Sequence, residues 1–506
     1  MESRTRNTKR NIIASYVLML LQIVFSFVSK SVIIYTLGSE YLGLSSLFNS
    51  ILMVLNVAEL GFTTSIVYFM YKPLAENDTE KVCALLAYLK RIYKFVGLII
   101  LFFGLLAGVL MPKLINGSVP DDINIYILYF LYLINTVISY FLFAHKTALL
   151  TAIQRLDLTK IAGCIVIVIQ YSLQLISLLI FKNYYLFVVS MIIGTALTNL
   201  FAAYISKIKF PQYRCVGKIT KQDKKDIITK VKGLLICNIS IVTYSTLDSI
   251  VISSFVGLTM VAIYSNYMTI YKAVNQFIVM IRSAMQSSVG NSVAKESIEK
   301  NLHDVFLWQF LFSLIATWCA SCMICLYQPF MKFWMGKKLL LPMLDVSLIV
   351  IWFLIDIVQQ AHYLYLTGAG LWNDLKYSYI FNTCCNLFLN VFLGKRFGVT
   401  GIISASLVTC IISGTFWQCI IIFRKYFKRS AKKYIMTQFK YFMLSAIVII
   451  ITYFSTCLVT FEGIVGIILK LLICCIVSAI LIFLLYCKNQ FFQESLVLTK
   501  RIIRKK

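Results

Sequence analysis

Long apolar segments alternate with short polar ones along the whole chain. Each apolar segment has about 20 residues or more, which is enough for an α-helix to cross a bilayer. The segments are continuously apolar and lack the two-residue alternation of barrel strands. We therefore predict an all-α integral membrane protein with about 14 spans: 11–37, 44–70, 92–111, 123–144, 161–181, 184–205, 233–256, 261–288, 305–328, 341–366, 377–393, 398–423, 438–459 and 463–487.

Basic residues divide the connecting segments into two sets. Eight segments, including the two ends of the chain, carry 37 Lys and Arg residues, whereas the four turns on the other side carry 7. Loops rich in Lys and Arg stay in the cytoplasm. We therefore expect both termini to be cytoplasmic, with the protein in a bacterial cytoplasmic (inner) membrane.

Composition supports a membrane protein. The 506 residues are 60% hydrophobic and only 13% charged, against about 25% charged in soluble domains. The net charge of +28 follows mainly from membrane orientation and predicts contact with anionic lipids. The basic stretch KITKQDKKDIITKVK (218–232) lies between two predicted spans, so we interpret it as the central cytoplasmic loop and expect no nucleic-acid partner.

A weak internal repeat divides the chain. In KSVIIYTLGSEYLGLS (30–45) and SIVISSFVGLTMVAIY (249–264), Gly38 aligns with Gly257 and Gly43 with Ala262, each between two predicted helices. Such a parallel repeat predicts two six-helix lobes around a central cleft, plus an extra C-terminal helix pair. The predicted domains are an N-terminal lobe (1–205), a basic cytoplasmic linker (206–232), a C-terminal lobe (233–424), and a helix pair with a basic tail (425–506).

Polar side chains form stripes on the four helices beside these turns. Unpaired polar groups are costly in lipid, so the stripes predict a hydrated cleft between the lobes. Lys272 lies eleven residues beyond position 261, about 16 Å into the membrane at 1.5 Å per residue. Ionisable groups at such depth are candidates for function. We predict these substrate-binding residues: Lys30, Lys272, Arg282, Asn56, Asn266, Asn275 and Gln276.

The predicted cleft also contains acids. Glu59, Asp248 and Asp356 are expected to balance the positive charges or to carry a coupling ion, H⁺ or Na⁺. A cationic interior suits a phosphate or pyrophosphate group. The accompanying amides and hydroxyls suit the hydroxyl groups of sugars.

At these residues the sequence resembles a known family. FVSKSVIIYTLGSEYLGLSSLFNSILMVLNVAELGF (27–62), VYFMYKPLAENDTEKV (67–82), LDSIVISSFVGLTMVAIYSNYMTIY (247–271) and GKRFGVTGIISASLVT (394–409) are similar to segments of bacterial polysaccharide repeat-unit flippases. These flippases belong to the multidrug/oligosaccharidyl-lipid/polysaccharide exporter superfamily. The family often has arginine where Lys30 stands, and lysine keeps the charge without the bidentate fork.

The resemblance implies a specific activity. Such proteins move undecaprenyl-pyrophosphate-linked oligosaccharides from the inner to the outer leaflet by alternating access, for cell-surface polysaccharide synthesis. The implied partners are the lipid-linked oligosaccharide and, in the same pathway, a polysaccharide polymerase and glycosyltransferases. A multidrug antiporter and a lipid II flippase of the same superfamily remain open as alternatives.

A membrane-embedded polysaccharide polymerase or acyltransferase is a further alternative. A polymerase of the familiar kind carries a large outside loop, whereas the longest outside loops here have about a dozen residues. For an acyltransferase the one deep histidine is His362, which we interpret as a packing residue. The sequence shows no paired catalytic carboxylates, P-loop or metal cluster, so we predict a transporter without a cofactor and not an enzyme.

The fifteen cysteines lie mostly within predicted spans. Cys319 and Cys322 have CxxC spacing, but no partner pair is evident near them in the sequence. We interpret the cysteines as small buried hydrophobic residues.

Overall fold

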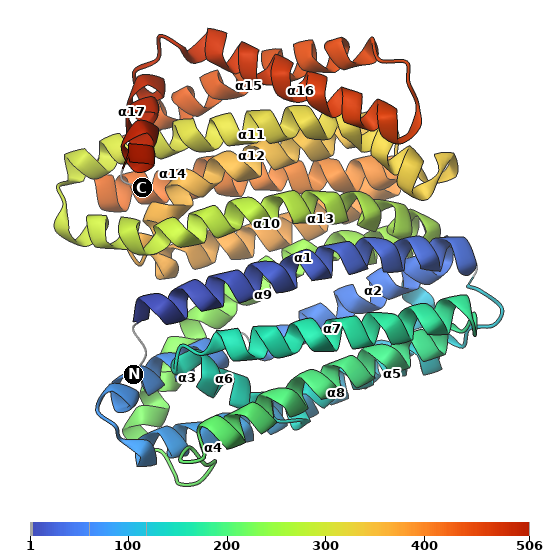
Figure 1. The fold of residues 1–506 in the computed structure, drawn as a ribbon, viewed down its shortest axis with the longest axis vertical. Coiled ribbons are helices and arrows are strands. Elements are labelled where there is room, and N and C mark those ends of the chain that lie inside the picture. Colours follow the sequence, from blue (N-terminus) through green and yellow to red (C-terminus); the bar gives the residue numbers. More distant parts are fainter. Residues whose placement is uncertain (1–3, 60, 118, 505–506) are drawn as a thin grey trace. The chain divides into compact units, whose positions relative to one another are not determined.

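All regular structure is helical in the residues that the computed structural model describes, which are 4–59, 61–117 and 119–504 (Figure 1). The all-α fold class is thereby confirmed. The helices are α1 (Arg4–Thr36), α2 (Ser39–Asn56), η1 (Val57–Glu59), α3 (Phe62–Ala75), α4 (Thr79–Leu114), α5 (Ile125–Phe141), α6 (His145–Ala152), α7 (Leu156–Leu179), α8 (Tyr184–Lys209), α9 (Lys221–Phe255), α10 (Leu258–Lys295), α11 (Ile298–Met335), η2 (Lys337–Leu339), α12 (Met343–Gly368), α13 (Trp372–Cys410), η3 (Ile411–Gln418), α14 (Cys419–Ile422), η4 (Phe423–Phe427), α15 (Lys432–Cys457), α16 (Gly463–Tyr486) and α17 (Gln490–Arg504).

Each predicted span coincides with one or more of these helices. By length and hydropathy alone, ten described segments can cross a membrane, or eleven if the bent pair α5–α6 is one span. Three features separate the count of eleven from the predicted 14. The segment α2–α3 is interrupted, α10 is too polar to pass the hydropathy test, and the test counts Trp372–Phe427 as one segment.

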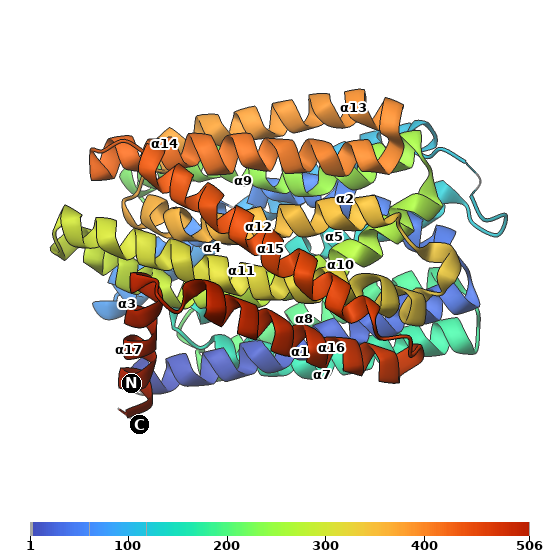
Figure 2. The same ribbon diagram turned by 90° about the horizontal axis from the view of Figure 1, so that it is seen from above.

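The segment Trp372–Phe427 is in fact two antiparallel helices. Gly398 breaks the helical backbone, with φ 58° and ψ −136°. Side chains on either side of the break then meet: Asn386 donates to Ser406 at 3.0 Å, and the Ser378 and Ser413 hydroxyls lie 3.0 Å apart. Figure 2 shows the resulting hairpin. The separate spans predicted at 377–393 and 398–423 are therefore present.

The span predicted at 44–70 is not one continuous helix. It is divided into α2, the single 3₁₀ turn η1, and α3, which begins after Gly61. At Gly61 a side chain would press on Val231 and Leu235 of α9, so the small residue allows α9 to approach the break. The break places Glu59 at the end of η1, where its carboxylate meets tyrosines of other helices.

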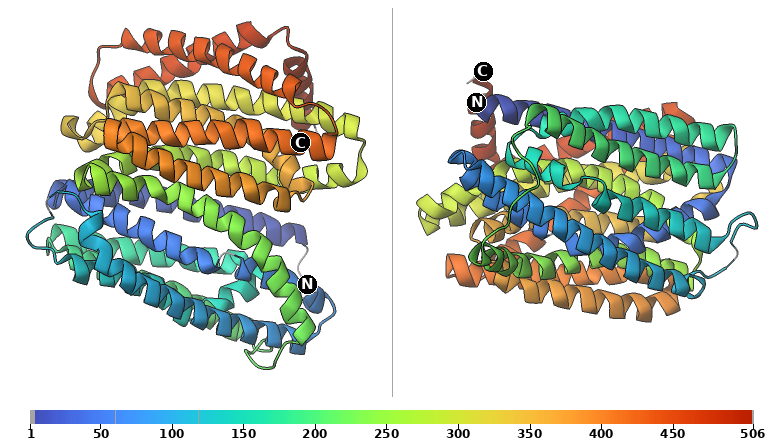
Figure 3. Two further views of the ribbon diagram at one scale, coloured as in Figure 1. Left: turned by 180° about the vertical axis from the view of Figure 1, so that it is seen from behind. Right: turned by 90° about the horizontal axis from the view of Figure 1, so that it is seen from below.

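The chain divides into two compact units, residues 1–262 and 263–506. In the first unit, α7 packs on α1 and α8, α5 packs on α4 and α8, and α9 lies beside α2 (Figures 1 and 3). In the second, α11 packs on α12, and α15 and α16 cross α11 (Figure 2). This division groups α9 with the first unit, and the lobe boundaries predicted from the repeat stay a prediction.

The repeat aligned at Gly38 and Gly257 has a geometric counterpart. Gly38 has φ 124° and donates to the Ile33 carbonyl at 3.1 Å, and Gly257 has φ 121° and donates to the Ile252 carbonyl at 3.0 Å. Both glycines end one helix and begin the next in a conformation that disfavours a side chain. The two turns are therefore built in the same way despite their low similarity in sequence.

One cysteine has a closer neighbour than the sequence indicated. The Cys322 sulfur on α11 lies 3.6 Å from the Cys474 sulfur on α16, and both thiols are free. The sequence shows no partner pair near the CxxC motif, and the structure places Cys474 of α16 beside it. The two cysteines are 152 residues apart, and only the packing of α16 on α11 brings them together.

Candidate functional site

A polar network joins α10 and α12 in the second unit. Its centre is Asp356 on α12, whose carboxylate oxygen Oδ2 accepts hydrogen bonds from the Tyr271 hydroxyl and the Asn275 amide, each at 2.9 Å. Both donors lie one helical turn apart on α10, so they face α12 together. Two of the residues predicted from the sequence, Asn275 and Asp356, are thus in direct contact.

Arg282 extends this network along the same two helices. Its guanidinium donates to Gln360 Oε1 at 2.6 Å and lies over the Tyr363 ring, 4.7 Å from the centroid. Gln360 in turn donates to the Asp356 backbone carbonyl at 3.0 Å. Arg282 also acts electrostatically on Asp356. The arginine is therefore held between an amide, an aromatic face and an acid.

The other predicted residues of α10 differ in environment. Asn266 is completely buried at 0% exposure, and neither atom of its amide has a hydrogen-bond partner in the described part of the chain. Lys272 and Gln276 are exposed and lie one turn apart on the same face. The polar stripe of α10 therefore has two parts. Asn275 and Arg282 contact α12, whereas Lys272 and Gln276 are exposed.

A second acidic network lies in the first unit. Glu59 Oε1 accepts from the Tyr93 hydroxyl of α4 at 2.9 Å and from the Thr63 hydroxyl of α3 at 3.2 Å. Tyr140 of α5 packs edge-on against the Tyr93 ring and donates to Asn56 Oδ1 at 3.2 Å. Like Asp356, Glu59 is thus a carboxylate that accepts hydrogen bonds from tyrosine and from a second polar side chain.

Two further predicted residues of the first unit, Lys30 and Asp248, are not part of the hydrogen-bond network around Glu59. Lys30 on α1 is partly buried, and Asp248 on α9 is buried at 4% exposure. Each takes part in a polar or electrostatic interaction within the protein.

Tyrosines and one glutamine are the functional candidates that sequence reasoning missed. Tyr93, Tyr140, Tyr271 and Gln360 contact the predicted acids or amides, yet none was singled out. Tyrosine counts as apolar in a hydropathy pattern, so the pattern does not reveal its hydroxyl group. The recurrence of tyrosine at helical spacing in predicted spans is the available signal, and it does not identify the partner.

The turns at Gly38 and Gly257, which correspond in the internal repeat, lie in contact within the first unit. The Thr259 hydroxyl donates to Glu40 Oε1 at 3.1 Å, and a side chain on Gly43 would overlap the Leu258 backbone. The Asn116 backbone N–H donates to the Ser253 carbonyl at 3.0 Å, and its side-chain amide donates to the Phe255 carbonyl at 3.2 Å. This contact of the two turns is defined by Glu40, Gly43, Leu258 and Thr259 and is called the turn contact below.

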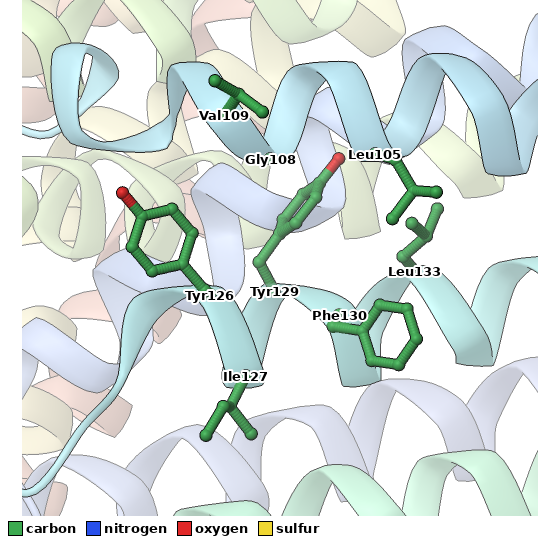
Figure 4. A pocket seen from close by; sticks show the side chains of 8 residues that line it. All are labelled: Leu105, Gly108, Val109, Tyr126, Ile127, Tyr129, Phe130 and Leu133. Atoms are coloured by element: carbon green, nitrogen blue, oxygen red, sulfur yellow. The ribbon is translucent and has the colours of Figure 1, made fainter.

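An apolar groove of about 390 Å³ lies between α4 and α5 (Figure 4). Tyr126, Tyr129 and Phe130 of α5 face Leu105 and Gly108 of α4, and the lining carries no charge. The Tyr129 hydroxyl is already bonded to the Gly104 carbonyl at 3.0 Å. The groove contains none of the predicted site residues and suits hydrocarbon better than a phosphate.

Asp356→Ala is expected to lower the free energy of unfolding by about 1–3 kcal/mol, because it leaves the Tyr271 and Asn275 donors without their acceptor. Asp356→Asn keeps an acceptor oxygen and should cost less. The check is thermal unfolding of the purified variants. Asp374→Ala, which removes an exposed ion pair with Lys425, is the control and should change little. Equal losses for Asp356→Ala and Asp374→Ala would contradict the proposed importance of the network.

No protein-family model and no curated protein sequence matches the chain significantly. Solved structures do match. The lipid II flippase MurJ in an inward closed conformation aligns with TM-score 0.66 and 14% identity over 94% of this chain and 98% of its own. A multidrug resistance MATE family transporter in an inward-facing conformation aligns with TM-score 0.64 and 13% identity over 85% and 99%.

A mutant of the Vibrio cholerae MATE transporter VcmN aligns with TM-score 0.56 and 13% identity over 84% of this chain and 98% of its own. At such identities the likeness concerns the fold. These structures are of transporters and a flippase, not enzymes. The chain therefore has the multi-pass, all-helical fold that MATE transporters of the MOP superfamily share with a lipid II flippase.

Proposed function

We propose that this protein is a flippase that moves undecaprenyl-pyrophosphate-linked oligosaccharide repeat units across the bacterial cytoplasmic membrane by alternating access. The fold supports transport, because its structural neighbours are MATE transporters and a lipid II flippase. The substrate class is proposed from the chemistry of this chain's own residues, as follows.

The observation that carries the proposal is the exposed lysine in the middle of α10. Lys272 is 14 residues from the start of the helix at Leu258, or about 21 Å along its axis. An ammonium at that depth is costly against hydrocarbon, so it favours a hydrated surface and an anionic cargo. Gln276 on the same face offers hydrogen bonds for sugar hydroxyls.

In this mechanism the head of the substrate enters from the cytoplasmic side while its lipid tail stays in the bilayer. Lys30 and Lys272 attract the pyrophosphate, and Arg282 contributes positive charge beside Asp356. Asn56, Asn275 and Gln276 bind the sugar, whereas Asn266, which the sequence also predicted for this role, is completely buried and is assigned no contact with the substrate. Glu59, Asp248 and Asp356 balance charge or carry a coupling proton or sodium ion, and the lobes then rock to expose the head on the other side.

A lipid II flippase is the second candidate. It is favoured by the alignment with MurJ, which extends over nearly the whole of both chains. Its substrate also carries a pyrophosphate, so the cationic residues fit either function. A multidrug antiporter fits the fold, but a cleft rich in lysine and arginine repels cationic drugs.

Deletion of the gene in its native host separates these functions. We expect loss of surface polysaccharide and accumulation of lipid-linked repeat units, both restored by the wild-type gene on a plasmid. Arrested growth with accumulation of lipid II would support the second candidate. Hypersensitivity to drugs with normal polysaccharide would support an antiporter and overturn the proposal.

A further inference from the structure

A second cavity, of about 760 Å³, lies in the second unit among α11, the start of α12, and the turn that joins α15 to α16. It is remote in sequence from the predicted substrate-binding residues and shares none of them. One wall is a face of α16 formed by Gly463, Gly466, Ile467 and Lys470, which follow one another at helical spacing.

Positive charge exceeds negative charge in this cavity. Lys332 is paired with Glu462 at 2.6 Å, and this hydrogen bond holds the pKa of Glu462 below its ordinary value. Lys470 lines the same cavity, and no hydrogen bond or ion pair joins it to another residue in the described part of the chain. Lys337 and Lys338 follow in η2 at the same end of α11.

The depth of Lys470 makes the absence of a hydrogen bond or ion pair to it, among the described residues, informative. It lies seven residues beyond Gly463, or about 10 Å into α16. A lysine at that depth in a membrane-spanning helix is costly unless its charge is compensated. The first backbone N–H groups of α16 also lack a side-chain cap, since Glu462 caps none of them. Helix N-termini of this kind attract anions.

The remaining walls combine apolar side chains with the polar side chains of Gln328, Thr456 and Thr460. Phe333 of α11 and Phe461 of the turn line the cavity together with Ile467. A site with a cationic interior, an uncapped helix terminus and aromatic walls matches a molecule that joins a phosphate to hydrocarbon. A volume of about 760 Å³ holds a phosphate, a glycerol and the first part of the acyl chains.

We propose that this cavity binds the phosphate headgroup of an anionic membrane lipid, with Lys470 as its charged partner and the α16 N-terminus as a second contact. The acyl chains leave along Phe333 and Ile467 toward the bilayer. Glu462 competes with the phosphate for Lys332. The proposal does not depend on which substrate the protein transports.

The test measures binding of dioctanoyl phosphatidic acid to the purified full-length protein in detergent, with dioctanoyl phosphatidylcholine and inorganic phosphate as the other ligands. We expect phosphatidic acid to bind more tightly than either. Lys470→Gln should weaken its binding about tenfold, and Lys470→Arg should restore it. Glu462→Gln should strengthen binding, because Lys332 becomes available to the phosphate.

Lys440→Gln is the matched control, since Lys440 is exposed on α15 and does not line the cavity. Equal weakening by Lys440→Gln and Lys470→Gln would show diffuse attraction by the basic protein and overturn the proposal. Equally tight binding of inorganic phosphate would overturn the lipid as ligand. If Lys470→Gln does not fold, Glu462→Gln decides, because unchanged or weaker binding in that variant contradicts the assigned geometry.

Discussion

Cross-linking the turn contact is expected to stop transport almost completely. In a variant with Glu40→Cys and Thr259→Cys, a short bifunctional thiol reagent should join the two turns, whose side chains are 3.1 Å apart in the structure. Alternating access requires each end of the transporter to open during the cycle. In the proposed function the turn contact separates during the cycle, so a covalent link across it should prevent that step, and reduction of a disulfide-forming linker should restore transport.

The readout is export of lipid-linked repeat units in cells before and after cross-linking. The two single-cysteine variants treated with the same reagent control for the native thiols. A second control pair, Asp374→Cys with Lys425→Cys, joins residues 3.3 Å apart within the second unit and should leave export intact. Full export by the cross-linked Glu40–Thr259 variant would show that the turn contact does not open during the cycle.

Lys272→Ala is expected to lower export of lipid-linked repeat units roughly 10- to 100-fold while the protein remains in the membrane. In the proposed function Lys272 donates a charge-assisted hydrogen bond to the phosphate, and the loss of such a bond costs about 1.5–3 kcal/mol. Because Lys272 is exposed, its truncation should leave the fold intact. Lys272→Arg keeps the charge and should retain most of the activity.

Lys433→Ala is the control for this variant, since Lys433 is an exposed lysine at the start of α15, outside the predicted site. The measurement combines surface polysaccharide per cell with the amount of protein in the membrane. Wild-type polysaccharide from Lys272→Ala at normal protein abundance would refute the assignment of Lys272 to substrate binding.

The hydropathy pattern determined the helices. Apolar segments long enough to span a bilayer can satisfy their backbone hydrogen bonds only within themselves, so the sequence predicts that they are helical and approximately where they lie. The interruption of the predicted span 44–70 was not predicted. The correspondence of Gly38 with Gly257 was also predictable, because a positive φ at a helix end favours glycine. Separate spans at 377–393 and 398–423 were also predicted from the sequence, whereas the position of the reversal at Gly398 comes from the structure.

Partners of the polar side chains were decided by tertiary structure. Helical periodicity shows which residues share a face, but it does not show which helix that face meets. Asp356 was a candidate from sequence, whereas its contact with Tyr271 depends on the packing of α10 against α12. Glu59 lies in η1, where the predicted span 44–70 is interrupted, and there it accepts a hydrogen bond from Tyr93 of α4.

The cavity beside Lys470 is likewise a feature that only the tertiary structure reveals. Its walls come from segments more than 100 residues apart, so no local pattern indicates that Lys332, Glu462 and Lys470 line one space. The sequence by itself determined that this is a many-helix membrane protein with buried charges in its spans. Only the tertiary structure decided which of those charges are neutralised within the protein, because neutralisation depends on contacts between helices and not on the order of residues within one.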